Sequence, residues 1–193
     1  AIIHPGEQTL PELQWIPVQT RKSVYHADPS GFIRQGFIHI LCEEYDYASG
    51  KGIIVSLKLD AATRKILRKV VALEKDYHLA FPFVFEFEYN FYCIPENSEG
   101  SNVDLYLYDI ETGLLVFNKT LVHGLKAVDP TLFHHGNLWW LFFTDKTSTN
   151  ERLHAWYSKN IFGPFTPHAN NPVKVDIRSS RPAGIPFMQG NML

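Results

Sequence analysis

Apolar residues in this chain gather into short runs that are rich in aromatic and β-branched side chains. Examples are residues 37–41, 91–94 and 138–143, and polar or glycine-containing turns such as Gly50-Lys51-Gly52 and Glu111-Thr112-Gly113 separate such runs. Short apolar runs bounded by turns of this kind are typical of β-strands. Since no stretch shows the sustained 3.6-residue apolar period of a helix, the pattern predicts an all-β chain.

The runs repeat in units of about 50 residues, each opened by a proline. Ala27-Asp28-Pro29, Phe81-Pro82 and Val128-Asp129-Pro130 each lead into a first apolar strand, and a fourth unit opens at Arg181-Pro182. After each first strand comes a polar or glycine tip, at Gln35-Gly36, Tyr89-Asn90 and Gly136-Asn137. A period of this length built from short strands is typical of a β-propeller with one four-stranded blade per unit.

We therefore expect a single, incomplete propeller domain over residues 1–193. Propellers have about four to eight blades, so three blades and part of a fourth would leave the ring open. The expected blades lie at about 24–73, 77–121 and 127–175, and a further blade starts at 181–193.

Charge and cysteine content argue against several classes of protein. The 193-residue chain has a net charge of -2 and scattered basic residues, so we predict no nucleic-acid partner. No apolar run reaches the roughly 18 residues of a membrane span. Cys42 and Cys93 lie inside apolar runs, which predicts buried free thiols rather than a disulfide or a metal pair. The sequence assigns no compartment.

Acidic residues recur where the second strand of each unit ends. In an antiparallel pair this end lies beside the motif that opens the first strand, so the units should bring these side chains to one face. The carboxylates at the end of the second strands belong to Glu43, Glu44, Glu96 and Asp145, and they should lie level with Asp28 and Asp129 of the opening motifs. Two histidines, His26 and His78, precede the motif in the first two units. We expect Asp28, Glu96 and Asp129 to point into one shared, aromatic-floored cavity.

Two interpretations of these acidic residues stay open. Carboxylates accept hydrogen bonds from sugar hydroxyls, and a pair of them can act as acid and base on a glycosidic bond. Equally, Asp before Pro is a common start of a turn, and the ends of strands are often acidic because they are solvated. The histidines are alternative ligands for a structural cation or an ordered water in the central channel; no other cofactor and no protein metal site is expected.

Several strings of the sequence resemble a known family. They are 78–86, 94–98, 128–133, 139–145, 157–168, 171–173 and 178–184. Together they resemble the propeller domain at the N-terminal side of glucosamine inositolphosphorylceramide transferases and their bacterial relatives. That domain in turn is similar to the five-bladed propellers of glycoside hydrolase family 43.

The resemblance implies roles for individual residues. Family 43 has an Asp as general base on the first innermost strand, which Asp28 matches, and a second Asp that orients the site, which Asp129 matches. The family's general acid is a Glu, but Arg181 stands at its place here. An arginine cannot release a proton, although it can bind a carboxylate or phosphate of a ligand. Glu96 remains as the candidate acid.

The sequence thus supports three functions. The preferred one is recognition of a glycan or other sugar-containing ligand, anionic or amino-bearing, next to a covalently adjoining transferase domain, with Glu43, Glu44, His26, His78, Asp145 and Arg181 as ligand-binding residues. The first alternative is an inverting glycoside hydrolase with Asp28 as base, Asp129 as orienting residue and Glu96 as acid. The second is a propeller that binds another protein.

Overall fold

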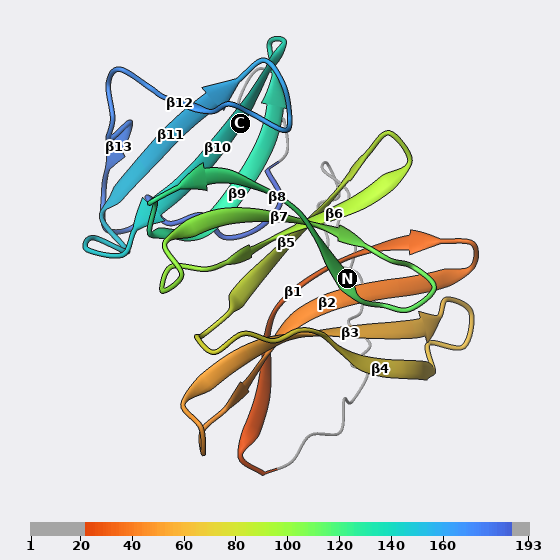
Figure 1. Ribbon diagram of the computed structural model, residues 1–193. Helices are drawn as coiled ribbons and strands as arrows, with labels where there is room; N and C mark the ends of the chain where they lie inside the picture. The colour runs from red at the N-terminus through yellow and green to blue at the C-terminus, as the bar shows by residue number, and fades with distance from the viewer. Residues whose placement is uncertain (1–21, 187–193) are drawn as a thin grey trace, which may run out of the picture.

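The computed structural model describes residues 22–186, which form three antiparallel sheets and no helix (Figure 1). Each sheet is a meander whose strands neighbour one another in chain order, except that the last strand of the third sheet pairs with the strand two before it. The first sheet contains β1 (Val24–Arg34), β2 (Phe37–Asp46), β3 (Lys51–Asp60) and β4 (Ile66–Leu73). The second contains β5 (Ala80–Phe87), β6 (Asn90–Glu96), β7 (Asn102–Tyr108) and β8 (Leu115–His123). The third contains β9 (Ala127–His135), β10 (Leu138–Asp145), β11 (Arg152–Ser158), β12 (Thr166–Pro167) and β13 (Lys174–Val175).

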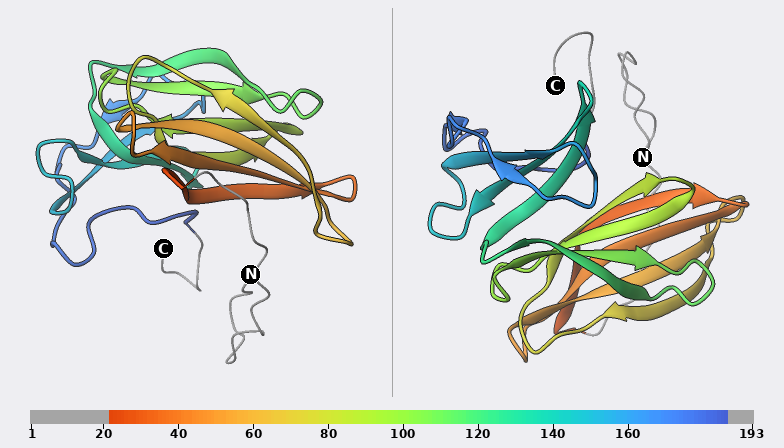
Figure 2. Two further views of the ribbon diagram at one scale, coloured as in Figure 1. Left: turned by 90° about the horizontal axis from the view of Figure 1, so that it is seen from below. Right: turned by 45° about the horizontal axis from the view of Figure 1, so that its top comes forward.

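The three sheets fan out from their first strands, as the blades of a propeller do (Figure 2). β5 packs against β1 on one side and against β9 on the other, so the first strands are the innermost ones. The expected fold class, an all-β propeller with about three blades and an open ring, is confirmed. Of the further blade expected at 181–193, residues 181–186 contain no strand and the rest lies outside the described residues.

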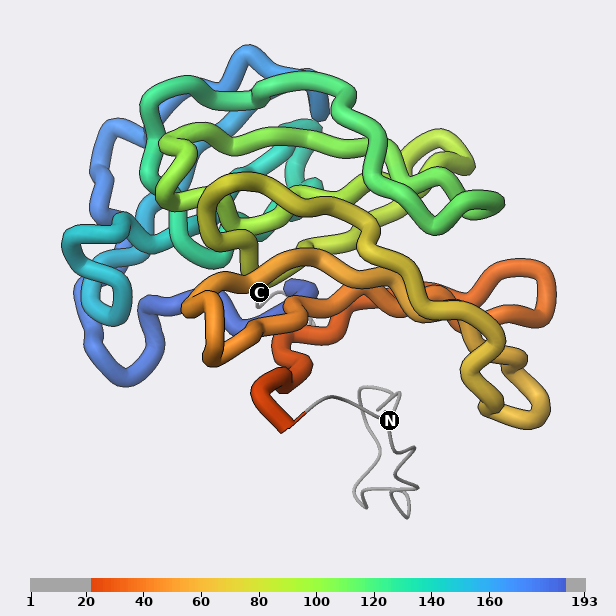
Figure 3. Tube along the Cα trace, turned by 60° about the horizontal axis from the view of Figure 1, so that its bottom comes forward, coloured from red at the N-terminus to blue at the C-terminus, as the bar shows by residue number. Residues whose placement is uncertain are grey.

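The outermost strand of the third blade is divided in two. β12 and β13 both pair with β11, one at each end of that strand. Pro164, Pro167 and Pro172 lie in this stretch. Because proline has no N–H to donate to a ladder, a continuous fourth strand cannot form here. After β13 the chain passes back beneath the innermost strands (Figure 3).

The middle blade buries both of its faces. Side chains alternate between the faces of a strand, so neighbouring residues belong to different cores. Ile94 and Leu105 pack with Leu141 of the third blade, whereas Cys93 and Tyr106 pack with residues of the first. Because both faces of this blade are buried, the sequence of the second unit contains nearly continuous apolar runs. Cys42 and Cys93 are both buried and free.

A β-bulge interrupts each innermost strand at its Xaa-Pro motif. Two residues of the inner strand oppose one residue of the neighbouring strand between Ala27 and Ser30 in β1, and the same irregularity recurs in β5 and β9. The residue before each proline has a positive φ: 49° at Asp28, 39° at Phe81 and 50° at Asp129. Such a φ is rare for residues other than glycine, and here it occurs once per blade at the same place.

Each of the second and third bulges turns a backbone N–H toward the preceding blade. The N–H of Asp129 donates to Oε2 of Glu96 at 3.2 Å, and the N–H of Phe81 acts on the carboxyl group of Asp28 and lowers its pKa. The recurring proline motif therefore serves as a joint between blades as well as a bend in a strand. Between residues 22 and 186 no helix offers the length and apolarity that crossing a bilayer requires.

Candidate functional site: a carboxylate cavity between the blades

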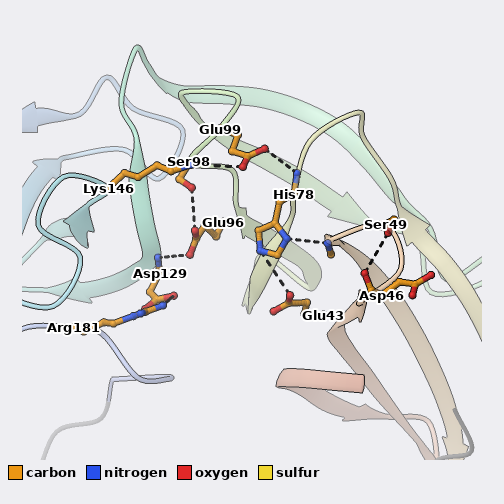
Figure 4. Close-up of polar contacts among 11 residues, drawn as sticks. Glu43, Asp46, Ser49, His78, Glu96, Ser98, Glu99, Asp129, Lys146 and Arg181 are labelled. Atoms are coloured by element: carbon orange, nitrogen blue, oxygen red, sulfur yellow. Dashed lines mark hydrogen bonds and ion pairs between the residues drawn. The ribbon is translucent and has the colours of Figure 1, made fainter. Parts of the chain in front are cut away.

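A cavity of about 380 Å³ opens where the three blades meet. The first blade contributes β1 and β2, the second contributes the segment before β5 and the end of β6, and the third contributes the bulge of β9. The returning segment after β13 completes the wall with Arg181. The lining residues are Tyr25, Asp28, Glu43, Tyr45, Tyr47, His78, Ala80, Glu96, Asp129 and Arg181. The cavity thus holds four carboxyl groups and one guanidinium, several of which Figure 4 shows.

Asp129 is clamped by Arg181. Nε of the guanidinium donates to Oδ2 of Asp129, and Nη2 donates to Oδ1 at 3.3 Å. Asp129 is buried, while the arginine side chain is half-exposed. Two parallel charge-assisted hydrogen bonds fix both the position and the orientation of a carboxylate. The hydrogen bond to Asp129 raises the pKa of Arg181, so this guanidinium stays charged.

Glu96 lies beside this pair and is held by two donors. Ser98 Oγ donates to Oε1 of Glu96 at 3.1 Å, and the Asp129 N–H donates to Oε2 (Figure 4). Burial, and then the negative charge of Asp129, raise the pKa of Glu96 above its ordinary value. At neutral pH this carboxyl group can therefore hold a proton.

Glu43 occupies the other end of the cavity, opposite His78. The residue is only 5% exposed, and its Oε1 lies 3.7 Å from Nε2 of the histidine. Burial, followed by the charges of Asp28, Glu96 and Asp129, raises the pKa of Glu43 to about 7. His78 accepts a hydrogen bond at Nδ1 from the Gly52 N–H at 2.8 Å, so a neutral ring carries its proton on Nε2 and directs it toward Glu43.

Gly52 is needed for this approach. A Cβ on Gly52 would lie 2.7 Å from Oε1 of Glu43 and 2.7 Å from Cε1 of His78. Both distances are shorter than van der Waals contact allows. The absence of a side chain on β3 thus lets the histidine and the glutamate face each other across the cavity.

Asp28 contributes the fourth carboxyl group. Burial and the charge of Asp129 raise its pKa, and Arg181 and the Phe81 N–H act in the opposite direction. Asp28, Glu43, Glu96, Asp129, His78 and Arg181 are therefore brought together around one cavity.

His26 and Glu44 are placed elsewhere. They are direct partners across β1 and β2, with Nε2 of His26 2.9 Å from Oε2 of Glu44, and Lys69 donates to the same carboxylate. Burial alone would raise the pKa of Glu44, but Lys69 and His26 outweigh it and lower that pKa. Since successive side chains of a strand point to opposite faces, Glu43 and Glu44 cannot both enter one cavity.

Asp145 is also outside the cavity lining. It accepts hydrogen bonds from the N–H of Thr147 at 2.8 Å and from the Thr147 hydroxyl at 2.6 Å. These two bonds lower its pKa although partial burial opposes them. Asp145 therefore stabilises the turn after β10, the structural role that acidic residues at strand ends often have.

The sequence reasoning missed three tyrosines of the lining, Tyr25, Tyr45 and Tyr47. Tyr45 and Tyr47 follow Glu43 at every second position, so strand alternation directs them to the same face. Tyr25 is the direct partner of Tyr45 across β1 and β2. The alternation Glu-x-Tyr-x-Tyr was the signal that would have found them. Within residues 22–186, no group of three or more His, Cys, Asp or Glu is arranged to hold a metal ion.

Solved structures share this fold. The catalytic domain of the GH62 α-L-arabinofuranosidase of Coprinopsis cinerea has a TM-score of 0.62 and 19% identity, covering 79% of this chain and 53% of that chain. An exo-β-1,3-galactanase from Clostridium thermocellum has a TM-score of 0.62 and 13% identity, covering 75% and 35%. The fold is thus that of the β-propellers found in family 43-like glycosidases, and at these identities the likeness concerns the fold alone.

The sequence comparison is more specific. The profile described as "Glucosamine inositolphosphorylceramide transferase 1, N-terminal" matches residues 16–193, and the chain belongs to this family. Curated relatives named glucosamine inositolphosphorylceramide transferase 1 are 31% identical over 160 residues in Oryza sativa subsp. japonica and 30% identical over 179 residues in Arabidopsis thaliana. The alignments cover 78% and 89% of this chain but only 21% and 23% of the relatives. The resemblance found in the sequence strings is confirmed, and family and fold define a carbohydrate-related propeller domain.

Proposed function

We propose that this propeller recognises a glycan in the carboxylate cavity and acts beside an adjoining transferase domain. The observation that carries the proposal is the composition of the cavity: four carboxyl groups, one guanidinium and three tyrosine rings around a space of about 380 Å³. Carboxylates accept hydroxyl hydrogen bonds, and aromatic rings cover the apolar face of a sugar. A surface for a protein partner would instead be expected to have an apolar centre with few charges.

The clamp on Asp129 favours recognition over hydrolysis. Arg181 stands where the resemblance places a general acid, and its side chain binds both oxygens of Asp129. This pair fixes the geometry of the cavity but supplies no proton. It also leaves guanidinium nitrogen positions at the half-exposed edge, where they can bind an acidic group of a ligand.

One observation favours the second candidate, an inverting glycoside hydrolase. Glu96 is buried, lines the same cavity as Asp28, and has a raised pKa, which suits a general acid. Asp28 would then activate water, with about 6.5–9.5 Å between the two carboxyl groups to leave room for it.

Binding by the intact protein on a glycan array tests the proposal. We expect binding that falls by about tenfold or more in Asp28→Asn and Asp129→Asn, because hydrogen bonds to charged groups contribute about 1.5–3 kcal/mol. Arg181→Ala should weaken binding similarly, because it frees the Asp129 carboxylate from its clamp. The control is Glu44→Gln, which changes an acidic residue that lies in the same blade as Asp28 but outside the cavity lining.

Hydrolysis is tested on the glycans that bind. Robust turnover by the wild type that is abolished in Glu96→Gln would establish the hydrolase instead of the recognition domain. Binding that survives the Asp28, Asp129 and Arg181 substitutions would show that the ligand site is not this cavity.

A further inference from the structure

Three tyrosines form a continuous wall at one end of the cavity. Tyr25 lies on β1, Tyr45 on β2, and Tyr47 directly after β2. Their ring centroids are 5.3 Å apart for Tyr25 and Tyr45, 5.4 Å for Tyr25 and Tyr47, and 5.5 Å for Tyr45 and Tyr47. The rings support one another, so their positions are fixed by packing within the cluster.

This wall is packed and yet open to solvent. Tyr47 is 70% exposed and Tyr25 is 40% exposed. Single exposed aromatic residues need no explanation, but a cluster of rings that continues the lining of a polar cavity is typical of a binding surface. Each ring offers an apolar face with a polar hydroxyl at its edge, as does the surface of a sugar ring.

Glu43 lies where this wall meets the carboxylates. Its side chain is more than nine-tenths buried and points into the cavity (Figure 4). In the part of the chain that the structure describes, Glu43 has no hydrogen bond, and Nε2 of His78 at 3.7 Å is beyond hydrogen-bonding distance. Buried carboxyl groups are normally hydrogen-bonded, so this one is available for donors of a ligand.

We infer that the carboxylates and the tyrosine wall are two adjoining sugar subsites, so that the ligand is an oligosaccharide with one sugar unit in each. One unit lies among Asp28, Glu96 and Asp129, and the next rests its apolar face on the wall. Glu43 and the Nε2–H of His78 bind hydroxyl groups at the junction between the two units. This inference rests on the proposed function, because it specifies the length of the glycan that the cavity takes.

Series of oligosaccharides with one to four sugar units test the inference. Xylo-, β-1,3-galacto- and gluco-oligosaccharides are titrated into the intact protein, followed by NMR chemical-shift changes or calorimetry. For the series that binds, affinity should rise at the second unit. Tyr47→Ala should reduce this gain by roughly three- to tenfold, the effect of losing one stacked ring, and should leave the affinity for the single unit unchanged.

Two variants separate stacking from other effects. Tyr47→Phe keeps the ring face and should keep the gain. Tyr89→Ala removes a tyrosine that is 83% exposed at the turn between β5 and β6, at the opposite end of β5 from the cavity, and should change nothing.

The outcomes distinguish the inference from the function on which it rests. A single sugar unit that binds as tightly as its longer oligomers, or a gain at the second unit that persists in Tyr47→Ala, overturns the two-subsite arrangement but leaves glycan recognition standing. No binding by any series or by the wider array overturns both.

Discussion

At the scale of single residues, Glu43 has the most unusual surroundings in the cavity. The titratable groups that face it are Asp28, Glu96, Asp129 and His78. Three of these are carboxyl groups, and burial lowers the pKa of the histidine, which favours its neutral form. Burial and like charge therefore act in the same direction, which is why the pKa rises from 4.5 to about 7.

This shift predicts a pH-dependent effect of Glu43→Gln on stability. A carboxyl group whose pKa is higher in the folded state stabilises the fold fully below about pH 4.5, and this stabilisation is lost as the pH rises to about 7. Gln mimics the protonated side chain at every pH. The difference in the free energy of unfolding, Glu43→Gln minus wild type, should thus be larger at pH 8 than at pH 5. The increase should be on the order of 1 kcal/mol.

Urea unfolding at the two pH values measures this difference. Glu44→Gln is the matched control, because Glu44 has a lowered pKa and pairs with Lys69 and His26 outside the cavity. Its difference from the wild type should not increase between pH 5 and pH 8. A Glu43→Gln effect that is equal at both pH values would contradict the raised pKa.

The neighbouring glutamates also show what the sequence leaves undetermined. Alternation implies that only one of Glu43 and Glu44 enters the cavity, but the choice depends on the register of β1 and β2. That register is set by the bulge at Asp28, whose positive φ runs against the usual extended preference of a residue before proline. The position of the bulge motif was predictable from the sequence, whereas its geometry was not.

At the scale of elements, a two-residue hairpin loop joins the first two strands of each blade. The central residues are Gln35-Gly36, Glu88-Tyr89 and Gly136-Asn137, and all six have positive φ. This geometry is that of a type I′ turn, which matches the twist of the strands it joins. The tip expected at Tyr89-Asn90 lies one residue earlier, because Asn90 pairs with Phe87 within the ladder.

The second of these turns lacks the glycine or asparagine that its backbone favours. Tyr89 has a φ of 64°, which is costly for a residue with a Cβ. Tyr89→Gly should raise the free energy of unfolding by about 0.5–1 kcal/mol, measured by urea unfolding. Tyr89→Ala keeps the Cβ and should give no comparable gain; equal gains would mean that removing the exposed ring, and not the strain, is responsible.

At the scale of the whole molecule, stability depends on the middle blade. Leu105 is fully buried in the core between the second and third blades. Leu105→Ala should lower the free energy of unfolding by about 2–5 kcal/mol, because it removes buried apolar contacts and leaves a cavity in the core. Val116, half-exposed on β8, is the comparison, since Val116→Ala should cost only about 0.5 kcal/mol. Denaturant unfolding measures both losses, and similar losses would show that the fold does not depend on the core between the second and third blades.

The sequence predicts more of the blade arrangement than of the candidate site. The recurring prolines and apolar runs specify strands, their order and the propeller, because these depend on local patterns. The contact of Arg181 with Asp129 joins residues 52 positions apart and depends on the path of the chain after β13. The sequence offers no local pattern for that path. The repeat placed Arg181 only at the start of a fourth unit, and its role as a ligand-binding candidate came from the family resemblance.

Two carboxyl groups of the proposed ligand site also act at the joints between the blades. Asp28 and Glu96 line the cavity and also interact with a backbone N–H of the next blade, that of Phe81 and that of Asp129 respectively. A carboxylate has about four acceptor positions, so one or two internal donors leave room for a ligand. Substitutions that remove these side chains loosen the joints as well as the site. In a cell, such variants would lose abundance together with any affinity for a ligand.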